Sequence, residues 1–134
     1  MTPNSSSPSA PQAMPTAWLV ALAAAWIFPG LLGHDPWKPD EAYTFGLVYS
    51  LLNGGDWMPT LAHEPFMEKP PLFYWSAATV AKLLSPPLAL HDAARLTTGL
   101  YMALTFGFVA VAARELYGRG RGPLATLLLM ACLG

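Results

Sequence analysis

The chain has 134 residues, of which 54% are hydrophobic and 11% are charged, and its formal net charge is −1. Soluble domains carry about 25% charged residues, so this composition excludes an ordinary water-soluble domain. The nearly balanced charge excludes a basic nucleic-acid-binding groove. The single cysteine, Cys132, excludes an intrachain disulfide and a cysteine-based zinc cluster, and the high apolar content excludes intrinsic disorder. What is left is a membrane protein.

The first segment is uncharged, because no Lys, Arg, Asp or Glu precedes Asp35. Residues 1–15 are rich in Ser and Pro and are predicted to form a disordered tail on the cytoplasmic side. The apolar run 17–33 is just long enough to cross a hydrocarbon core of about 30 Å, and Pro29-Gly30 predicts a kink or an early end there. A cleaved signal peptide is the alternative, which the missing basic segment and the polar tail disfavour.

A polar loop follows at 34–92, and residues 35–69 hold six of the eight acidic residues. Pro39 favours an extended approach, and Asp40 is suited to cap a helix over 40–53. The expected apolar face of this helix consists of Phe45, Val48, Tyr49 and Leu52, and Asn53-Gly54-Gly55 is expected to end it.

A second short helix is predicted over 71–84, after the pair Pro70-Pro71. Phe73, Ala77, Val80 and Leu84 recur at helical spacing, whereas Ser76, Thr79 and Lys82 fall on another side. This pattern is typical of an amphipathic helix that lies on the membrane surface rather than crossing it.

The clearest spanning helix is predicted over 93–113, where Arg95 and Arg114 flank 18 uncharged residues and can extend to the two interfaces. The last apolar run, 123–134, is too short to span, so we expect a chain truncated within a helix. With the helix over 71–84 on the surface, the Arg-bearing loop 114–122 and the acidic loop face opposite sides. The positive-inside rule then places 114–122 in the cytoplasm and 34–92 outside.

Two groups in the outer loop have catalytic potential. Asp40 and Glu41 are predicted to lie at a helix N-terminus, and the simpler interpretation is that Asp40 caps the helix and Glu41 complements its dipole. Together with a lysine on the same outer loop, such a carboxylate could also serve a reaction on a phosphate-linked substrate. Lys69 is held by the prolines after it and is suited to meet a phosphate, although a lysine anchored among interfacial aromatic residues is the simpler interpretation. His34, His63 and nearby acids allow a divalent metal, but no two histidines have the spacing of metal ligands, so no metal ligand is assigned.

Several short motifs, taken in their order along the chain, resemble those of a known family. Asp40-Glu41-Ala42, the turn at 55–57, Glu64-Pro65 and the run Glu68-Lys69-Pro70-Pro71-Leu72-Phe73-Tyr74-Trp75 are followed by Ala93-Ala94-Arg95-Leu96. In this order they resemble the amino-terminal part of the GT-C membrane glycosyltransferases, in particular the bacterial branch related to aminoarabinose transferases of lipid A and to protein O-mannosyltransferases. The match runs from about Trp18 to the last residue.

The resemblance implies an inverting transferase that moves a sugar from a polyprenyl-phosphate donor to a glycolipid or protein hydroxyl. The expected place is the outer face of the bacterial inner membrane, in a multi-pass protein with a periplasmic catalytic loop. By resemblance Asp40 is the essential acid and Lys69 meets the donor phosphate, while Glu41 and Glu68 adjust these groups or hold a divalent ion. Relatives often carry Arg where this chain has Tyr43, which is retained as a supporting residue of the site. Relatives are also several times longer, so we expect this chain to be a fragment without turnover by itself.

Two other classes of function stay open. A small membrane accessory protein, which binds lipid-linked sugar or a partner subunit without chemistry, is the main alternative. A transporter fragment is disfavoured, because the predicted spanning runs carry no charge in the middle.

Overall fold

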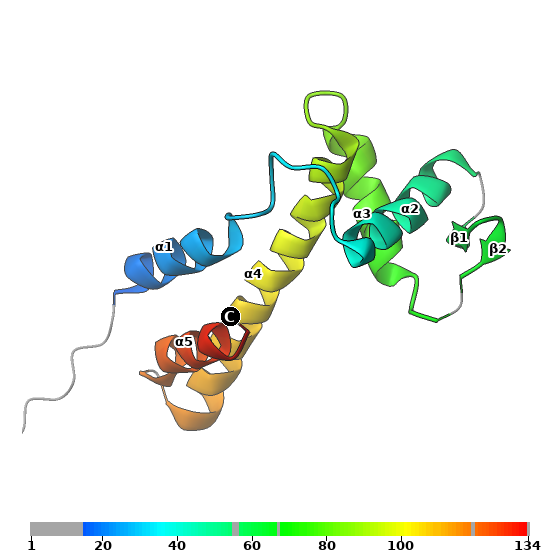
Figure 1. Cartoon of the computed structure of the whole chain (residues 1–134). Helices are drawn as coiled ribbons and strands as arrows, with labels where there is room; N and C mark the ends of the chain where they lie inside the picture. The colour runs from blue at the N-terminus through cyan, green and yellow to red at the C-terminus, as the bar shows by residue number, and fades with distance from the viewer. Residues whose placement is uncertain (1–14, 55–56, 67, 119, 134) are drawn as a thin grey trace, which may run out of the picture.

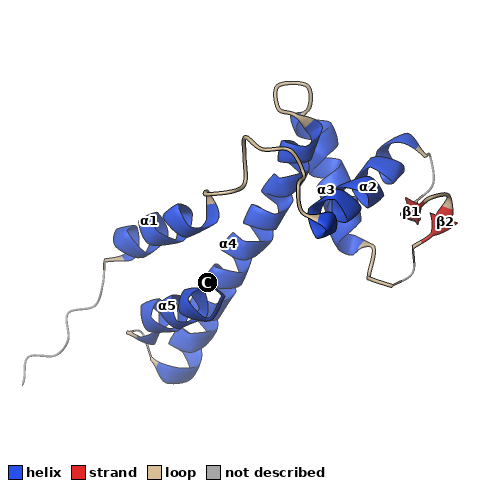
Figure 2. Ribbon diagram, viewed as in Figure 1, coloured by secondary structure: helices blue, strands red, loops and turns tan. Residues whose placement is uncertain are grey.

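The computed structural model describes residues 15–54, 57–66, 68–118 and 120–133. Residues 1–14, which make up most of the predicted tail, lie outside this set. Within the described residues the chain is mostly helical, which confirms the expected helical fold (Figures 1 and 2). The elements are α1 (Thr16–Ile27), α2 (Pro39–Asn53), β1 (Thr60–Leu61), β2 (Glu64–Pro65), α3 (Leu72–Leu84), α4 (Leu90–Tyr117) and α5 (Arg121–Leu133).

Helix α4 is the longest element and the scaffold for the rest. Its 28 residues span about 42 Å at 1.5 Å per residue. Among the described residues it is the one helix that is both long and apolar enough to cross a membrane, and most of its apolar surface is exposed. It begins before and ends after the predicted range 93–113, because the residues on either side continue the helical hydrogen bonding.

Helix α1 is shorter than predicted for the run 17–33. It has 12 residues and ends at Ile27, which corresponds to about 18 Å and is less than the thickness of a hydrocarbon core. The chain then turns, and Gly30 and Gly33 adopt φ values of +90° and +87°, which a glycine adopts without steric cost. The early end suggested by Pro29-Gly30 is therefore what the structure has.

The helices pack in two groups along α4 (Figure 1). Helix α3 packs beside the first half of α4, and α2 crosses α3 with the small β1–β2 hairpin next to it. Helix α5 packs along the last part of α4, and α1 contacts both of them. The loop region expected outside the membrane is thus one compact unit at one end of the long helix.

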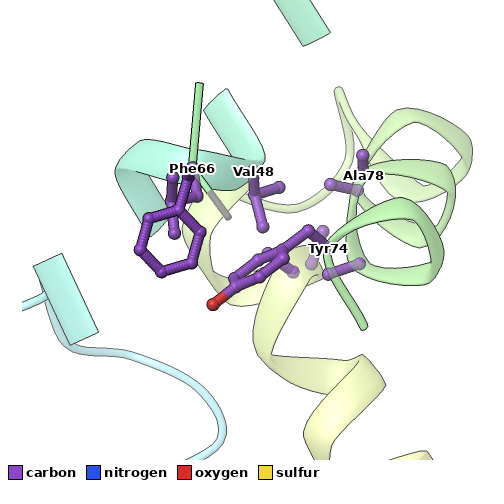
Figure 3. Close-up of a cluster of buried hydrophobic side chains, with 9 residues drawn as sticks. Val48, Phe66, Tyr74 and Ala78 are labelled. Carbon is purple, nitrogen blue, oxygen red and sulfur yellow. The ribbon is translucent and has the colours of Figure 1, made fainter. Parts of the chain in front are cut away.

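A hydrophobic cluster holds this unit together (Figure 3). Tyr74 lies in its centre, with Val48 and Phe66 on one side and Ala78 on the other. Small residues dominate where α3 meets α4, so the two backbones can approach closely. The buried members are Leu47, Val48, Phe66, Tyr74, Ala77, Ala78, Ala81, Ala93 and Ala94.

The buried faces of α2 and α3 differ from the predicted ones. On α3 the buried residues are Tyr74, Ala77, Ala78 and Ala81, so the face is rotated away from Phe73, Val80 and Leu84. On α2, Leu47 and Val48 are buried, whereas Tyr49 is 52% exposed. The cause on α3 is that this helix packs on α4 through its alanines, whereas α2 packs mainly on α3. Hydropathy alone does not reveal which face packs.

The hairpin is an element that the sequence did not predict. Thr60 pairs with Pro65 and Leu61 with Glu64 around a two-residue turn. Both turn residues, Ala62 and His63, have positive φ values of 52° and 71°, as a type I′ turn requires. The signal was missing because such turns usually contain Asn or Gly. The Thr60 N–H donates to the Ser50 hydroxyl over 3.0 Å, which attaches the hairpin to α2.

The contact of α5 with α4 depends on Gly122, and this gives a first prediction. A Cβ atom there would lie 2.9 Å from the Ala110 carbonyl oxygen, so the helix backbones would have to separate. We expect Gly122→Ala to lower the free energy of unfolding by about 1–3 kcal/mol, measured by thermal unfolding in detergent with circular dichroism. Gly107→Ala is the control, because nothing lies within 4 Å of its Cβ position and alanine favours helix by about 1 kcal/mol. Equal effects of the two substitutions would contradict the close approach.

Candidate functional site

A cavity of about 770 Å³ lies between α2, α3 and α4. Asp40, Glu41 and Lys69 all line it, although Lys69 follows Asp40 by 29 positions in the sequence. The structure therefore brings three of the predicted site residues to one place. The remaining wall is mainly apolar and aromatic, with Phe45, Leu72, Phe73, Tyr74, Ala77 and Tyr101 among its residues.

The carboxylates of Asp40 and Glu41 are presented by the first turn of α2. The helix begins at Pro39, and the capping position is Lys38, which has no side-chain capping hydrogen bond. The prediction that Asp40 caps the helix is thus wrong by two positions, because proline is well suited to the first helical residue. The N-terminal end of the helix dipole favours negative charge at both carboxylates. Asp40 is exposed, whereas Glu41 is partly buried.

Glu41 is held by Arg95, which sequence reasoning had assigned to the membrane interface. Glu41 Oε2 lies 3.6 Å from Arg95 Nη2. Arg95 Nη1 also donates hydrogen bonds to the His34 carbonyl oxygen and, over 3.1 Å, to Asp92 Oδ1. The Arg95 side chain is only 13% exposed. Arg95 therefore joins α4 to α2 and to the segment before α2.

Two histidines lie beside this arginine. His34 Nε2 is 3.8 Å from Glu41 Oε1, and His91 Nε2 is 3.6 Å from Asp35 Oδ1 and 3.7 Å from Asp92 Oδ1. His91 also lines the cavity. Asp92 lies in the first turn of α4. A polar residue near a helix start gives no sign of its distant partners, so these contacts could not be predicted.

Lys69 is exposed, and within the described part of the chain it forms no ion pair. It comes three residues before the start of α3, and Pro70 and Leu72 line the cavity with it. Prolines on the C-terminal side restrict its backbone. An ammonium group that has no internal partner is available to an anion that enters the cavity.

Tyr43 and Glu68, the two predicted supporting residues, lie outside the described lining of the cavity. The Tyr43 ring packs edge-on against Phe66, which packs in the same way against Tyr74. The pKa of Tyr43 is raised, first by desolvation and then by the negative charge of Glu68. Burial, Tyr43 and Glu68 raise the pKa of Tyr74 in the same direction. Tyr74, unlike Tyr43, lines the cavity.

The described residues were compared with the requirements of a metal site. They contain no group of three or more His, Cys, Asp or Glu side chains that could hold a metal ion. A further cavity of about 520 Å³ lies between α1, α4 and α5, and its lining is almost wholly apolar. The cavity at α2 therefore differs from this one in that charged side chains line it.

In comparisons with known proteins, no protein-family model, curated protein or solved structure matches this chain.

Proposed function

We propose that this chain is the amino-terminal part of a GT-C type membrane glycosyltransferase, which transfers a sugar from a polyprenyl-phosphate donor to a hydroxyl of a glycolipid or a protein. The observation that carries this proposal is the shared cavity of Asp40 and Lys69. One residue supplies a carboxylate and the other an ammonium group. These are the two groups that a displacement at a phosphate-linked sugar carbon requires.

The lining of the cavity supports a lipid-linked donor. A wall of apolar and aromatic side chains surrounds the few charged ones, so the cavity suits a molecule with a charged head and a hydrocarbon tail. A free nucleotide sugar would need more polar partners than this wall provides. The exposed apolar surface of α4 supports contact of the same cavity with a bilayer.

The proposed reaction assigns one role to each group. The Asp40 carboxylate accepts the proton of the acceptor hydroxyl as its oxygen attacks the anomeric carbon. The bond between that carbon and the phosphate oxygen breaks, and the Lys69 ammonium stabilises the charge that develops on the departing phosphate. Glu41 and Glu68 adjust these groups. A divalent ion is not required for this scheme.

The proposed topology puts the cavity outside the bacterial inner membrane. Helix α4 crosses the bilayer, α3 packs beside its outer half without crossing, α2 lies at the outer surface, and residues 114–122 face the cytoplasm, in agreement with the positive-inside rule. A multi-pass transferase of this kind meets its lipid donor at the periplasmic face.

Thiol labelling tests this topology. In a Cys132→Ser background we expect an impermeant thiol reagent to label Ala62→Cys in intact cells and to spare Gly120→Cys. Both positions are exposed, so burial does not limit the labelling. Each variant should be labelled fully after lysis, which is the control for reactivity. Equal labelling of the two in intact cells would refute the proposed orientation.

Binding of the donor phosphate tests the role of Lys69. We expect Lys69→Gln to weaken binding of undecaprenyl phosphate to the chain in nanodiscs by about tenfold, because a charge-assisted hydrogen bond is lost. Lys82→Gln is the matched control, because Lys82 is exposed near the end of α3 and carries the same charge. Titration followed by tryptophan fluorescence gives both dissociation constants. Equal weakening by the two variants would mean that only the net charge matters.

A further inference from the structure

The ion pair between Glu41 and Arg95 has an unusual feature. The two nearest atoms, Oε2 and Nη2, are 3.6 Å apart, which is too long for a hydrogen bond. Both atoms are buried, and neither has a hydrogen-bond partner among the described residues. A buried polar atom without a partner is unfavourable and uncommon in folded proteins, so this pair calls for a group that satisfies both atoms.

The surroundings allow one of the two groups to move. The guanidinium of Arg95 is fixed from the other side by the His34 carbonyl oxygen and by Asp92. The Glu41 side chain is 33% exposed, and its second oxygen, Oε1, has His34 as a distant neighbour at 3.8 Å. A small displacement of the Glu41 carboxylate would therefore open the space between Oε2 and Nη2 toward the cavity that both residues line.

The chemistry of the pair selects the group that enters. Arg95 Nη2 can only donate a hydrogen bond, and the Glu41 carboxylate oxygen can only accept one. A phosphate would satisfy the arginine but would be repelled by the carboxylate, and an ammonium group would have the opposite conflict. A hydroxyl group accepts from the one and donates to the other, without a net charge.

We propose that Glu41 and Arg95 form a subsite for a hydroxyl group of the lipid-linked sugar, next to the Lys69 phosphate position in the same cavity. This inference rests on the proposed function, because it assumes that a lipid-linked sugar enters the cavity. It reassigns Glu41 from adjusting the catalytic base to recognising the substrate. A hydroxyl of the acceptor has the same chemistry and is distinguished by the experiment.

The experiment compares carriers with and without a sugar, using the chain in nanodiscs. The probes are undecaprenyl phosphate and its mannosyl, glucosyl, galactosyl and arabinosyl forms. We expect at least one sugar to raise the affinity about tenfold or more, as hydrogen bonds to two charged groups would. Glu41→Gln and Arg95→Lys should remove this gain. Arg114→Lys and Glu115→Gln are the matched controls, since they alter an exposed pair at 3.1 Å near the other end of α4.

Deleting the hydroxyl on the ligand gives an independent measurement that needs no Arg95 variant. Single-deoxy forms of the preferred carrier are titrated against the unchanged chain and against Glu41→Gln. For one hydroxyl, the loss of affinity caused by deleting it and the loss caused by Glu41→Gln should not add, because both changes remove the same interaction. The subsite would be overturned if the losses of affinity were additive for every hydroxyl. It would also be overturned if the sugar still raised the affinity in both Glu41→Gln and Arg95→Lys.

The remaining outcomes separate this inference from the proposed function. If undecaprenyl phosphate binds through Lys69 but no sugar raises the affinity, the proposed function stands and the sugar-hydroxyl subsite fails. If undecaprenyl phosphate does not bind, the proposed function fails, and the subsite fails with it. If Glu41→Gln instead weakens binding of lipid A or of a serine-containing peptide and leaves the sugar gain intact, the hydroxyl belongs to the acceptor.

Discussion

Replacing Asp40 by Asn is expected to lower the rate of sugar transfer by a factor of about 100–10,000, the usual contribution of a general base. The substitution keeps the size and the polar character of the side chain in the first turn of α2 but removes the basic carboxylate. Because Asp40 is exposed, little folding stability depends on it. Loss of transfer would therefore report chemistry rather than unfolding.

The assay needs the natural polypeptide that contains this sequence, made in membranes and supplied with a polyprenyl-phosphate sugar and an acceptor. Asp35→Asn is the matched control, because Asp35 lies five residues earlier with a side chain that is 95% exposed and outside the described lining of the cavity. Amounts of both variants in the membrane are compared by immunoblot. Transfer at the original rate by Asp40→Asn would remove Asp40 from the reaction. Absence of transfer by the unchanged protein would favour a binding protein without chemistry.

Replacing Arg95 by Met is expected to lower the free energy of unfolding by about 3 kcal/mol. The removal of one member of a buried ion pair typically costs about 3–5 kcal/mol, because the partner charge is left without compensation. Here two carboxylates, Glu41 and Asp92, would lose their cation. The lower end of the range applies because water reaches the Glu41 side chain. Such a loss is a large part of the 5–15 kcal/mol that stabilises a typical protein.

The control for this variant is Arg114→Met on the same helix. Arg114 pairs with Glu115 at 3.1 Å, but the two side chains are 55% and 66% exposed, and such surface pairs contribute about 0–1 kcal/mol. Thermal unfolding in detergent gives the global effect. Hydrogen exchange should show the largest increase around His34 and Glu41, because Arg95 connects those residues to α4. Equal destabilisation by both variants would mean that Arg95 is only a surface charge.

The sequence by itself determined most of the helical segmentation. The range 40–53 was predicted where α2 covers Pro39–Asn53, and 71–84 where α3 covers Leu72–Leu84. These limits depend on prolines and glycines within a few residues of each helix end, so local steric effects are sufficient to set them. Composition likewise indicated a membrane protein, and α4 is long and apolar enough to cross a bilayer.

Only the tertiary structure decided which residues meet. The buried face of α3, the β1–β2 hairpin and the contacts of Arg95 all depend on packing between segments that are distant in the sequence. The His34 carbonyl oxygen and the Arg95 guanidinium are 61 positions apart, and neither residue carries a local mark of the other. Because a side chain's partners are set by how helices pack, and this packing follows the shapes of both surfaces, one arginine at a predicted membrane boundary became the centre of the candidate site.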